Sequence, residues 1–120
     1  MKKILLAEDE VMLLKTLEFK LKKDGYEIVA VQNGQEAIDK LSSEKFDLVV
    51  TDMMMPFKGG LDVIAAVKEA EGEIPVVVLS SVGQEEMVVK AFKLGAEDYI
   101  TKPFSPNEFS MRIAKILKTE

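Results

Sequence analysis

The chain of 120 residues contains no histidine, no cysteine and no tryptophan. These absences exclude Ser-His and Cys-His catalytic pairs, disulfides, thiolate metal sites and phosphorylation of a histidine in this chain. Aromatic residues make up only 7%, and no cluster of them could stack a flavin. Any chemistry must therefore come from carboxylates, hydroxyls, amines and the backbone.

Long hydrophobic runs and an excess of basic charge are also missing. The longest apolar run, Pro75–Leu79, is far shorter than the roughly 20 residues that span a bilayer. The start at Met1–Ala7 looks like a signal peptide only briefly, because the acidic run Glu8–Glu10 follows it. The net charge of −5 disfavours nucleic-acid phosphates and anionic membranes as partners. We expect a soluble, cytoplasmic protein that binds neither directly.

Short apolar segments alternate with helical stripes along the whole chain. Strands are predicted at Ile4–Ala7, Glu27–Val31, Leu48–Asp52, Val76–Leu79 and Asp98–Thr101. Helices are predicted from apolar residues at helical spacing in Val11–Leu21, Ala37–Leu41, Leu61–Val67, Met87–Phe92 and Phe109–Ile116. Helix stops are predicted at Gly25, near Gly72 and at Gly95, and a capping box is predicted at Ser105–Glu108.

This pattern predicts an α/β fold. Strands that are apolar throughout and alternate with helices form a parallel sheet covered on both faces. Because crossovers between parallel strands are right-handed, the sheet should be doubly wound. No linker and no repeat divides the sequence. We therefore expect one domain over residues 1–120, with five parallel strands and five helices in three layers.

Polar residues gather where the predicted strands end. Glu8, Asp9 and Glu10 follow the first strand, and Asp52 ends the third. Ser80 ends the fourth strand, and Lys102 follows the fifth. Singly, each has an ordinary explanation as a helix start, a turn, a cap or a solvated lysine. In an open α/β sheet, however, the carboxyl ends of the strands form one binding edge, so we expect these groups to converge.

The converging groups suit phosphoryl transfer. Clustered carboxylates repel one another, and a hard divalent cation removes that repulsion. An oxygen site with few protein ligands suits Mg²⁺, with Mn²⁺ as an alternative. A carboxylate held by such a cation can accept a phosphoryl group as an aspartyl phosphate. Lys102 and Ser80 could then stabilise the charge on the phosphoryl oxygens.

The same segments carry a family resemblance. They are Ile4–Glu10, Asp47–Pro56 with Gly60, Pro75–Ser80 and Gly95–Phe104. Together they resemble the CheY-like receiver domain of bacterial two-component response regulators over essentially all 120 residues. The 22 positions from Ser80 to Lys102 fit that family. The resemblance implies a flavodoxin-like sheet of order 2-1-3-4-5 and a cis bond between Lys102 and Pro103.

The resemblance also implies roles for individual residues. Asp52 would be the phosphoacceptor, and Ser80 and Lys102 would contact the phosphoryl oxygens. Asp9, Asp52 and the backbone carbonyl of Met54 would bind Mg²⁺ directly, and Glu8 would bind it through water. The donor would be a phosphohistidine on a sensor histidine kinase or phosphotransfer protein, with acetyl phosphate as a small substitute. The domain would then catalyse only its own phosphorylation and dephosphorylation.

Ser80 and Tyr99 would form the switch. Once the Ser80 hydroxyl moves toward a phosphoryl group, the Tyr99 ring can turn inward into the space. This would change the surface of the fourth helix, fifth strand and fifth helix. Its mixed charges resemble a face through which related receivers form homodimers: Lys90, Lys93, Glu97, Asp98, Arg112 and Lys115. A solvated face that makes no dimer explains these charges as well. The downstream output domain or target remains open.

Four positions depart from the family pattern. Glu8 stands where aspartate is commoner, which a water-mediated contact tolerates. Met54 and Val82, two positions after Asp52 and Ser80, are apolar and cannot position the hydrolytic water by hydrogen bonding. Ser81 stands where the family often has alanine, and its larger side chain slightly narrows the access of water to the site. We therefore expect slow self-dephosphorylation.

Three other functions compete with this interpretation. A Mg²⁺-dependent phosphatase of the haloacid-dehalogenase type would need a second acid where Met54 stands, and a cap domain. A nucleotide or flavin module would need a glycine-rich phosphate motif, and none is present. A receiver fold that acts only as a protein-interaction module would not need Asp9, Asp52, Ser80 and Lys102 together.

Overall fold

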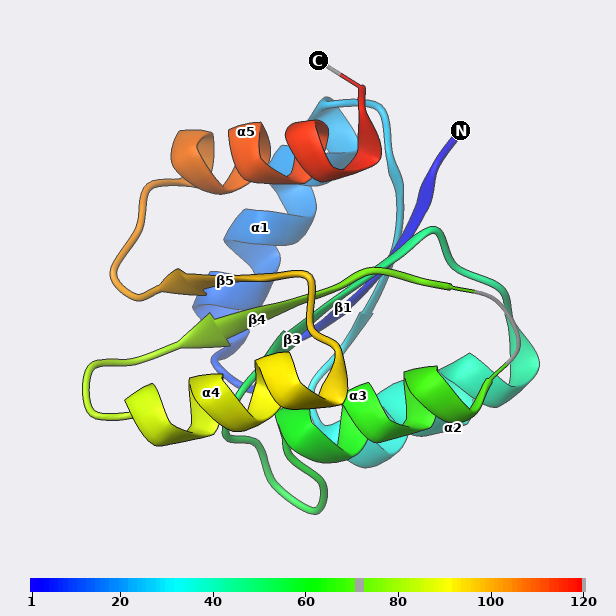
Figure 1. Cartoon of the computed structure of the whole chain (residues 1–120). Coiled ribbons are helices and arrows are strands. Elements are labelled where there is room, and N and C mark those ends of the chain that lie inside the picture. The colour runs from blue at the N-terminus through cyan, green and yellow to red at the C-terminus, as the bar shows by residue number, and fades with distance from the viewer. Residues whose placement is uncertain (71–72, 120) are drawn as a thin grey trace.

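The computed structural model describes residues 1–70 and 73–119. Strands and helices alternate along the chain (Figure 1). The strands are β1 (Lys3–Ala7), β2 (Glu27–Val31), β3 (Leu48–Asp52), β4 (Val76–Ser80) and β5 (Asp98–Thr101). The helices are α1 (Val11–Lys23), α2 (Gly34–Ser43), α3 (Gly60–Glu69), α4 (Glu85–Leu94) and α5 (Pro106–Leu117). The predicted helix stop near Gly72 lies outside the described residues.

The strands form one parallel sheet in the order β2-β1-β3-β4-β5. The predicted fold class and strand order are therefore confirmed. In the register, Asp52 lies beside Leu79 and Ser80 lies beside Thr101. Three strands thus end at one edge of the sheet, and the polar residues that follow them come together there.

The helices cover both faces of the sheet. Helices α1 and α5 lie on one face, and α2, α3 and α4 lie on the other (Figure 1). Because side chains alternate along a strand, Ile4 and Leu6 enter the core under α1 and α5, whereas Leu5 and Ala7 enter the other core. All four are fully buried. The continuous apolar character of the strands follows from this burial on two sides.

The cap before α5 forms only in part. The Ser105 hydroxyl accepts a hydrogen bond from the Glu108 N–H at 3.0 Å, and Pro106 is the first helical residue. The predicted return bond from the Glu108 side chain is not among the contacts of the described residues. Instead, the Glu108 carboxylate lies 3.6 Å from Arg112. Arg112 lies one helical turn after Glu108, and its charged guanidinium attracts the Glu108 carboxylate more strongly than the neutral Ser105 N–H does.

Two further features lie in the loops beside the carboxyl edge. The Lys102–Pro103 bond is cis, as the resemblance implies. In the run of three methionines, Met53 is fully buried and Met55 packs against the core. Met54 differs, because its side chain is 55% exposed. In the described ranges, no helix combines the length and apolar character needed to cross a membrane.

Candidate functional site

One ammonium group joins three carboxylates at the carboxyl edge of the sheet. The Lys102 Nζ lies 3.0 Å from Glu8 Oε2 and 3.1 Å from Asp52 Oδ2. It also lies 3.3 Å from Glu10 Oε1. The structure therefore brings together residues from the ends of β1, β3 and β5. Their separation in the sequence is large, so only the doubly wound sheet makes these contacts.

Backbone contacts hold the three loops in place. The Glu8 N–H donates to the Val31 carbonyl at 3.1 Å, and the Lys102 N–H donates to the Ser80 carbonyl at 2.7 Å. The N–H of Met53 donates both to the Leu79 carbonyl and to the Asp52 Oδ1, the latter at 2.9 Å. The N–H of the next residue in the chain thus orients the Asp52 carboxylate. The parallel register continues into these loops and places the side chains.

A glycine lets α3 begin close to the phosphoacceptor candidate. The Gly60 N–H donates to the Met53 carbonyl at 2.8 Å. A Cβ atom at Gly60 would lie 2.7 Å from the Asp52 carbonyl oxygen. Because that neighbour is backbone, it could not move aside cheaply. Gly60 therefore permits the tight turn that returns the chain from the end of β3.

Burial is unusually deep for charged groups. Glu8 is 0% and Asp52 is 6% exposed. The Oε1 atom of Glu8 accepts a hydrogen bond from the Glu10 N–H at 3.1 Å. The Oε2 atom is buried and accepts no hydrogen bond of good geometry from any described residue, although the Lys102 ammonium lies near it. A buried carboxylate oxygen in this state has capacity for a further cation.

These surroundings shift three pKa values upward. Burial raises the pKa of the Glu8 carboxyl to about 7, and the negative charge of Asp52 adds to the rise. Burial also raises the pKa of Asp52, against the opposing effect of Lys102. For Lys102, burial acts to lower the pKa, but the hydrogen bond to Glu8 and the charge of Asp52 raise it overall. Burial thus disfavours the state in which Glu8 and Asp52 are both ionised beside a single ammonium.

The acidic residues fit a small divalent cation. Oxygen atoms of Glu8, Asp9 and Asp52 all lie within 4.8 Å of one another. All three donors are hard oxygen ligands, which Mg²⁺ prefers. Asp9 is exposed, so water could complete the coordination. The donor set and the Glu8 oxygen without a hydrogen bond are both compatible with a metal site.

In the described residues, the side chains of Ser80 and Tyr99 make no hydrogen bond to the carboxylates of this cluster. Ser80 is 2% exposed at the end of β4, and within residues 1–70 and 73–119 its hydroxyl makes no hydrogen bond to Asp52. The Tyr99 ring is 40% exposed on the edge strand. It packs edge-on against Phe92, with ring centroids 5.8 Å apart. Val82, at 82% exposure, and Met54 are also at the surface.

Glu10 is the contact residue that the sequence did not single out. It appears in the acidic run after β1, but no role was predicted for it. In the structure, its backbone contacts Glu8 and its carboxylate contacts Lys102. The sequence signal that points to it is its place in the acidic run after the first strand, at the edge where the polar groups are expected to converge. That signal is weak, because acidic residues are common at the start of a helix.

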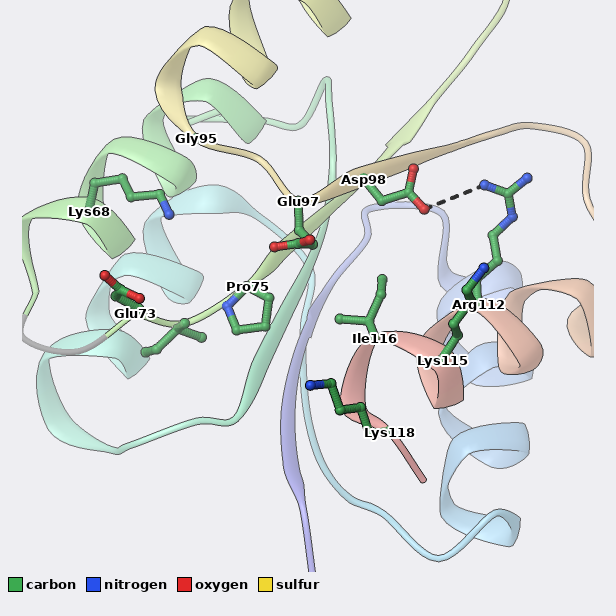
Figure 2. A pocket seen from close by; sticks show the side chains of 11 residues that line it. Lys68, Glu73, Pro75, Gly95, Glu97, Asp98, Arg112, Lys115, Ile116 and Lys118 are labelled. Carbon is green, nitrogen blue, oxygen red and sulfur yellow. Dashed lines mark ion pairs between the residues drawn. The ribbon is translucent and has the colours of Figure 1, made fainter. Parts of the chain in front are cut away.

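A separate hollow of the described surface lies elsewhere (Figure 2). It is a groove of about 1120 Å³ between the end of α3, the start of β5 and α5. Lys68 and Lys118 extend into it from opposite sides, and Arg112 lies 3.6 Å from Asp98. The groove is at the amino ends of β4 and β5, and Asp52 is at a carboxyl end. Size alone therefore does not identify the candidate site, and the carboxylate cluster is the better candidate.

Comparison with known proteins agrees with the observed fold. A family model described as the response regulator receiver domain matches residues 4–114. The transcriptional regulatory protein PhoP for alkaline phosphatase synthesis of Bacillus subtilis is 37% identical over 117 residues, which are 98% of this chain and 49% of that protein. Matches to ResD of the same organism cover 48% of that relative. The chain thus spans about half the length of these curated relatives.

Solved structures give the same result. A receiver domain from a Francisella response regulator has a TM-score of 0.88 at 28% identity, with 98% of each chain covered. A CheY-like receiver domain protein from Methanospirillum hungatei has a TM-score of 0.91 at 26% identity, covering 98% of this chain and 94% of that one. Sequence, topology and both comparisons agree, and the chain belongs to the response regulator receiver domain family of two-component systems.

Proposed function

We propose that Asp52 accepts a phosphoryl group from a phosphohistidine on a sensor histidine kinase or a phosphotransfer protein. The main support is the Lys102 ammonium, 3.1 Å from the buried Asp52 carboxylate. A cation beside the acceptor offsets the charge that develops on the phosphoryl oxygens. The functional unit would be residues 1–120 as one receiver domain acting in the cytoplasm.

Asp52 would be the nucleophile. One of its carboxylate oxygens attacks phosphorus, and a P–O bond forms as the P–N bond to the donor imidazole breaks. The electron pair of that bond leaves with the imidazole, which is protonated from solvent. Lys102 and Ser80 contact the phosphoryl oxygens. The reaction consumes the domain's own carboxylate, so the domain catalyses its own modification and its slow reversal only.

The acidic cluster would hold Mg²⁺, with Mn²⁺ as a substitute. Asp9, Asp52 and the Met54 backbone carbonyl would bind it directly, and Glu8 would bind it through water. When bound, the cation would neutralise charge on the phosphoryl oxygens. Support comes from the oxygens of Glu8, Asp9 and Asp52, which lie within 4.8 Å of one another.

Phosphorylation would be read out on the surface of α4, β5 and α5. The Ser80 hydroxyl moves toward the phosphoryl group, and the exposed Tyr99 ring turns inward, which shifts a two-state population. A homodimer would then form through this surface. The output domain or target protein that responds is not specified by any residue of the domain.

The test is the intact mass of the protein after incubation with Mg²⁺ and acetyl phosphate. We expect the gain of one phosphoryl group, which is abolished in Asp52→Asn and by chelation of the metal. Lack of any gain, with Mg²⁺ binding intact, would favour a receiver that depends strictly on its kinase or a receiver fold that acts only by protein interaction. Turnover of a phosphate ester would favour an aspartyl-phosphate phosphatase, although Met54 stands where that chemistry needs a second acid.

A further inference from the structure

Glu10 sits at the cap position of α1 but does not cap the helix with its side chain. It has an extended backbone (φ −80°, ψ 104°) and makes no side-chain hydrogen bond to the first turn. Shorter polar residues usually fill this position. The Glu10 carboxylate instead lies 3.3 Å from Lys102 Nζ, 92 residues away in the chain. Its side chain therefore faces the site.

The backbone of Glu10 contacts the same site. Its N–H donates to Glu8 Oε1 at 3.1 Å. One residue thus orients Glu8 with its amide and contacts Lys102 with its carboxylate. Glu8 in turn lies 3.0 Å from Lys102 through its other oxygen. These contacts link the start of α1 to the loop after β5.

The three carboxylates around Lys102 are not equivalent. Glu8 and Asp52 belong to the group of oxygens that could hold a cation, and Glu10 does not. A cation and the Lys102 ammonium would therefore compete for Glu8 and Asp52. The Glu10 side chain is 64% exposed, whereas that of Lys102 is 14% exposed. Glu10 is the one partner that the ammonium could keep while a cation occupies the other two.

We propose that Glu10 is a positioning residue for Lys102. It holds the ammonium at the edge of the site when a divalent cation engages Glu8 and Asp52, and so it keeps Lys102 beside the phosphoacceptor. This inference rests on the proposed function for the role of Lys102. Binding of the cation is favoured, because the displaced ammonium retains a carboxylate partner and does not return to bulk water.

Mg²⁺ titration by calorimetry on the full chain tests the proposal. We expect Glu10→Gln to weaken Mg²⁺ binding about two- to fivefold, the range for a partly exposed ion pair. The matched control is Glu86→Gln in the first turn of α4, which removes the same charge near the same edge of the sheet and has no contact with Lys102. An equal loss in both variants would contradict the proposal.

A double-mutant cycle separates the effect of the contact between Glu10 and Lys102 from the effect of the Glu10 charge on the cation. If Glu10 acts through Lys102, Glu10→Gln should have no further effect in a Lys102→Gln background. If Glu10 only adds negative charge, the loss will be the same in both backgrounds, and the proposal fails. Glu10 is exposed, so Glu10→Gln should fold, and unfolding midpoints check that the Lys102→Gln proteins fold as well.

A second readout concerns phosphorylation by acetyl phosphate at saturating Mg²⁺. Glu10→Gln should lower the maximal rate and leave the half-saturating donor concentration unchanged, because it displaces Lys102 and does not alter donor access. An altered half-saturation with an unchanged maximal rate would contradict the proposal. If acetyl phosphate does not phosphorylate the wild-type chain, the proposed transfer to Asp52 loses this support, whereas the Mg²⁺ titration still judges the contact between Glu10 and Lys102.

Discussion

At the residue scale, Glu8 combines complete burial with an ionisable group. Its side chain is 0% exposed, and burial raises the pKa of its carboxyl to about 7. The Lys102 ammonium and the Glu10 N–H act in the opposite direction but do not cancel the loss of water. A carboxylate in these surroundings is costly unless a cation joins it.

This shift predicts how stability depends on pH in metal-free buffer. Between the ordinary value of 4.5 and about 7, folded Glu8 keeps its proton, whereas unfolded Glu8 loses it. The folded state therefore binds more protons in this window, and the free energy of unfolding should fall as pH rises. The raised pKa of Asp52 also makes the free energy of unfolding fall as pH rises. Urea unfolding at several pH values measures the slope.

The control for this prediction is Glu8→Gln, which cannot titrate. Its stability should depend less on pH through the same window, with the remaining slope due to Asp52. Addition of Mg²⁺ should stabilise the wild-type protein most at the upper end of the window, where both carboxyls are ionised. Parallel pH profiles for wild type and Glu8→Gln would refute the prediction.

Residue identity also predicts a long-lived phosphoryl group. Met54 and Val82 are exposed at 55% and 82%, and neither can hydrogen-bond a water molecule. The phosphorylated state should therefore outlast seconds. Met54→Asn should shorten its lifetime by roughly tenfold, less than the full effect of a positioned general base. Decay of the phosphorylated mass after removal of the donor gives the lifetime.

The control for the effect of Met54→Asn on the lifetime is Met111→Asn on α5. Met111 is 72% exposed and lies on an element that supplies no carboxylate to the cluster. It should leave the lifetime unchanged. A wild-type lifetime of seconds, or equal effects of the two substitutions, would show that the apolar character of Met54 does not slow hydrolysis.

At the element scale, glycines set how closely segments approach. The start of α2 lies against the loop between β3 and α3, which carries Lys58. A Cβ atom at Gly34 would lie 2.0 Å from the Lys58 carbonyl oxygen. Gly25, by contrast, has a left-handed φ of 100° and open space around its missing Cβ. The two glycines are thus required for different reasons.

Alanine substitutions should distinguish these reasons. Gly34→Ala forces backbone to move and should destabilise the fold by about 1–3 kcal/mol, as overpacking does. Gly25→Ala meets no neighbour and should cost only the left-handed conformation, about 1–2 kcal/mol. Gly34→Ala should also shift amide resonances of the β3–α3 loop, whereas Gly25→Ala should not. The absence of loop shifts in Gly34→Ala would contradict the close approach seen here.

At the scale of the whole molecule, the surface of α4, β5 and α5 presents apolar and charged side chains together. Phe92 and Tyr99 are 43% and 40% exposed. Arg112 lies 3.6 Å from Asp98 within the same chain and donates to the Tyr99 carbonyl at 3.2 Å. A partner with the same surface could exchange such ion pairs across a two-fold axis.

We therefore expect phosphorylation to shift the protein from monomer to dimer. Light scattering before and after treatment with Mg²⁺ and acetyl phosphate should show the change, and Asp52→Asn should stay monomeric. Arg112→Ala should weaken the dimer only a few-fold, because exposed ion pairs contribute about 0.2–1 kcal/mol each. A phosphorylated protein that stays monomeric at high concentration would exclude this surface as a dimer interface.

Much of the architecture could be read from the sequence. The alternation of apolar segments and helical stripes predicted every strand and helix, because burial on two sides demands continuous apolar strands. Glu27–Val31 and Asp98–Thr101 were predicted with the bounds observed. The return bond of the Ser105 cap was predicted wrongly, because the cap motif was considered without Arg112, which lies four residues after Glu108 and attracts its carboxylate.

The sequence by itself determined the fold class and which polar residues follow which strands, since the parallel sheet brings all strand ends to one edge. Only the tertiary structure decided which of those groups touch. The contact of Lys102 with Glu10, the complete burial of Glu8 and the packing of Tyr99 on Phe92 depend on strand register and side-chain packing. Such distances between residues far apart in the chain are set by the assembled core, and no local pattern encodes them.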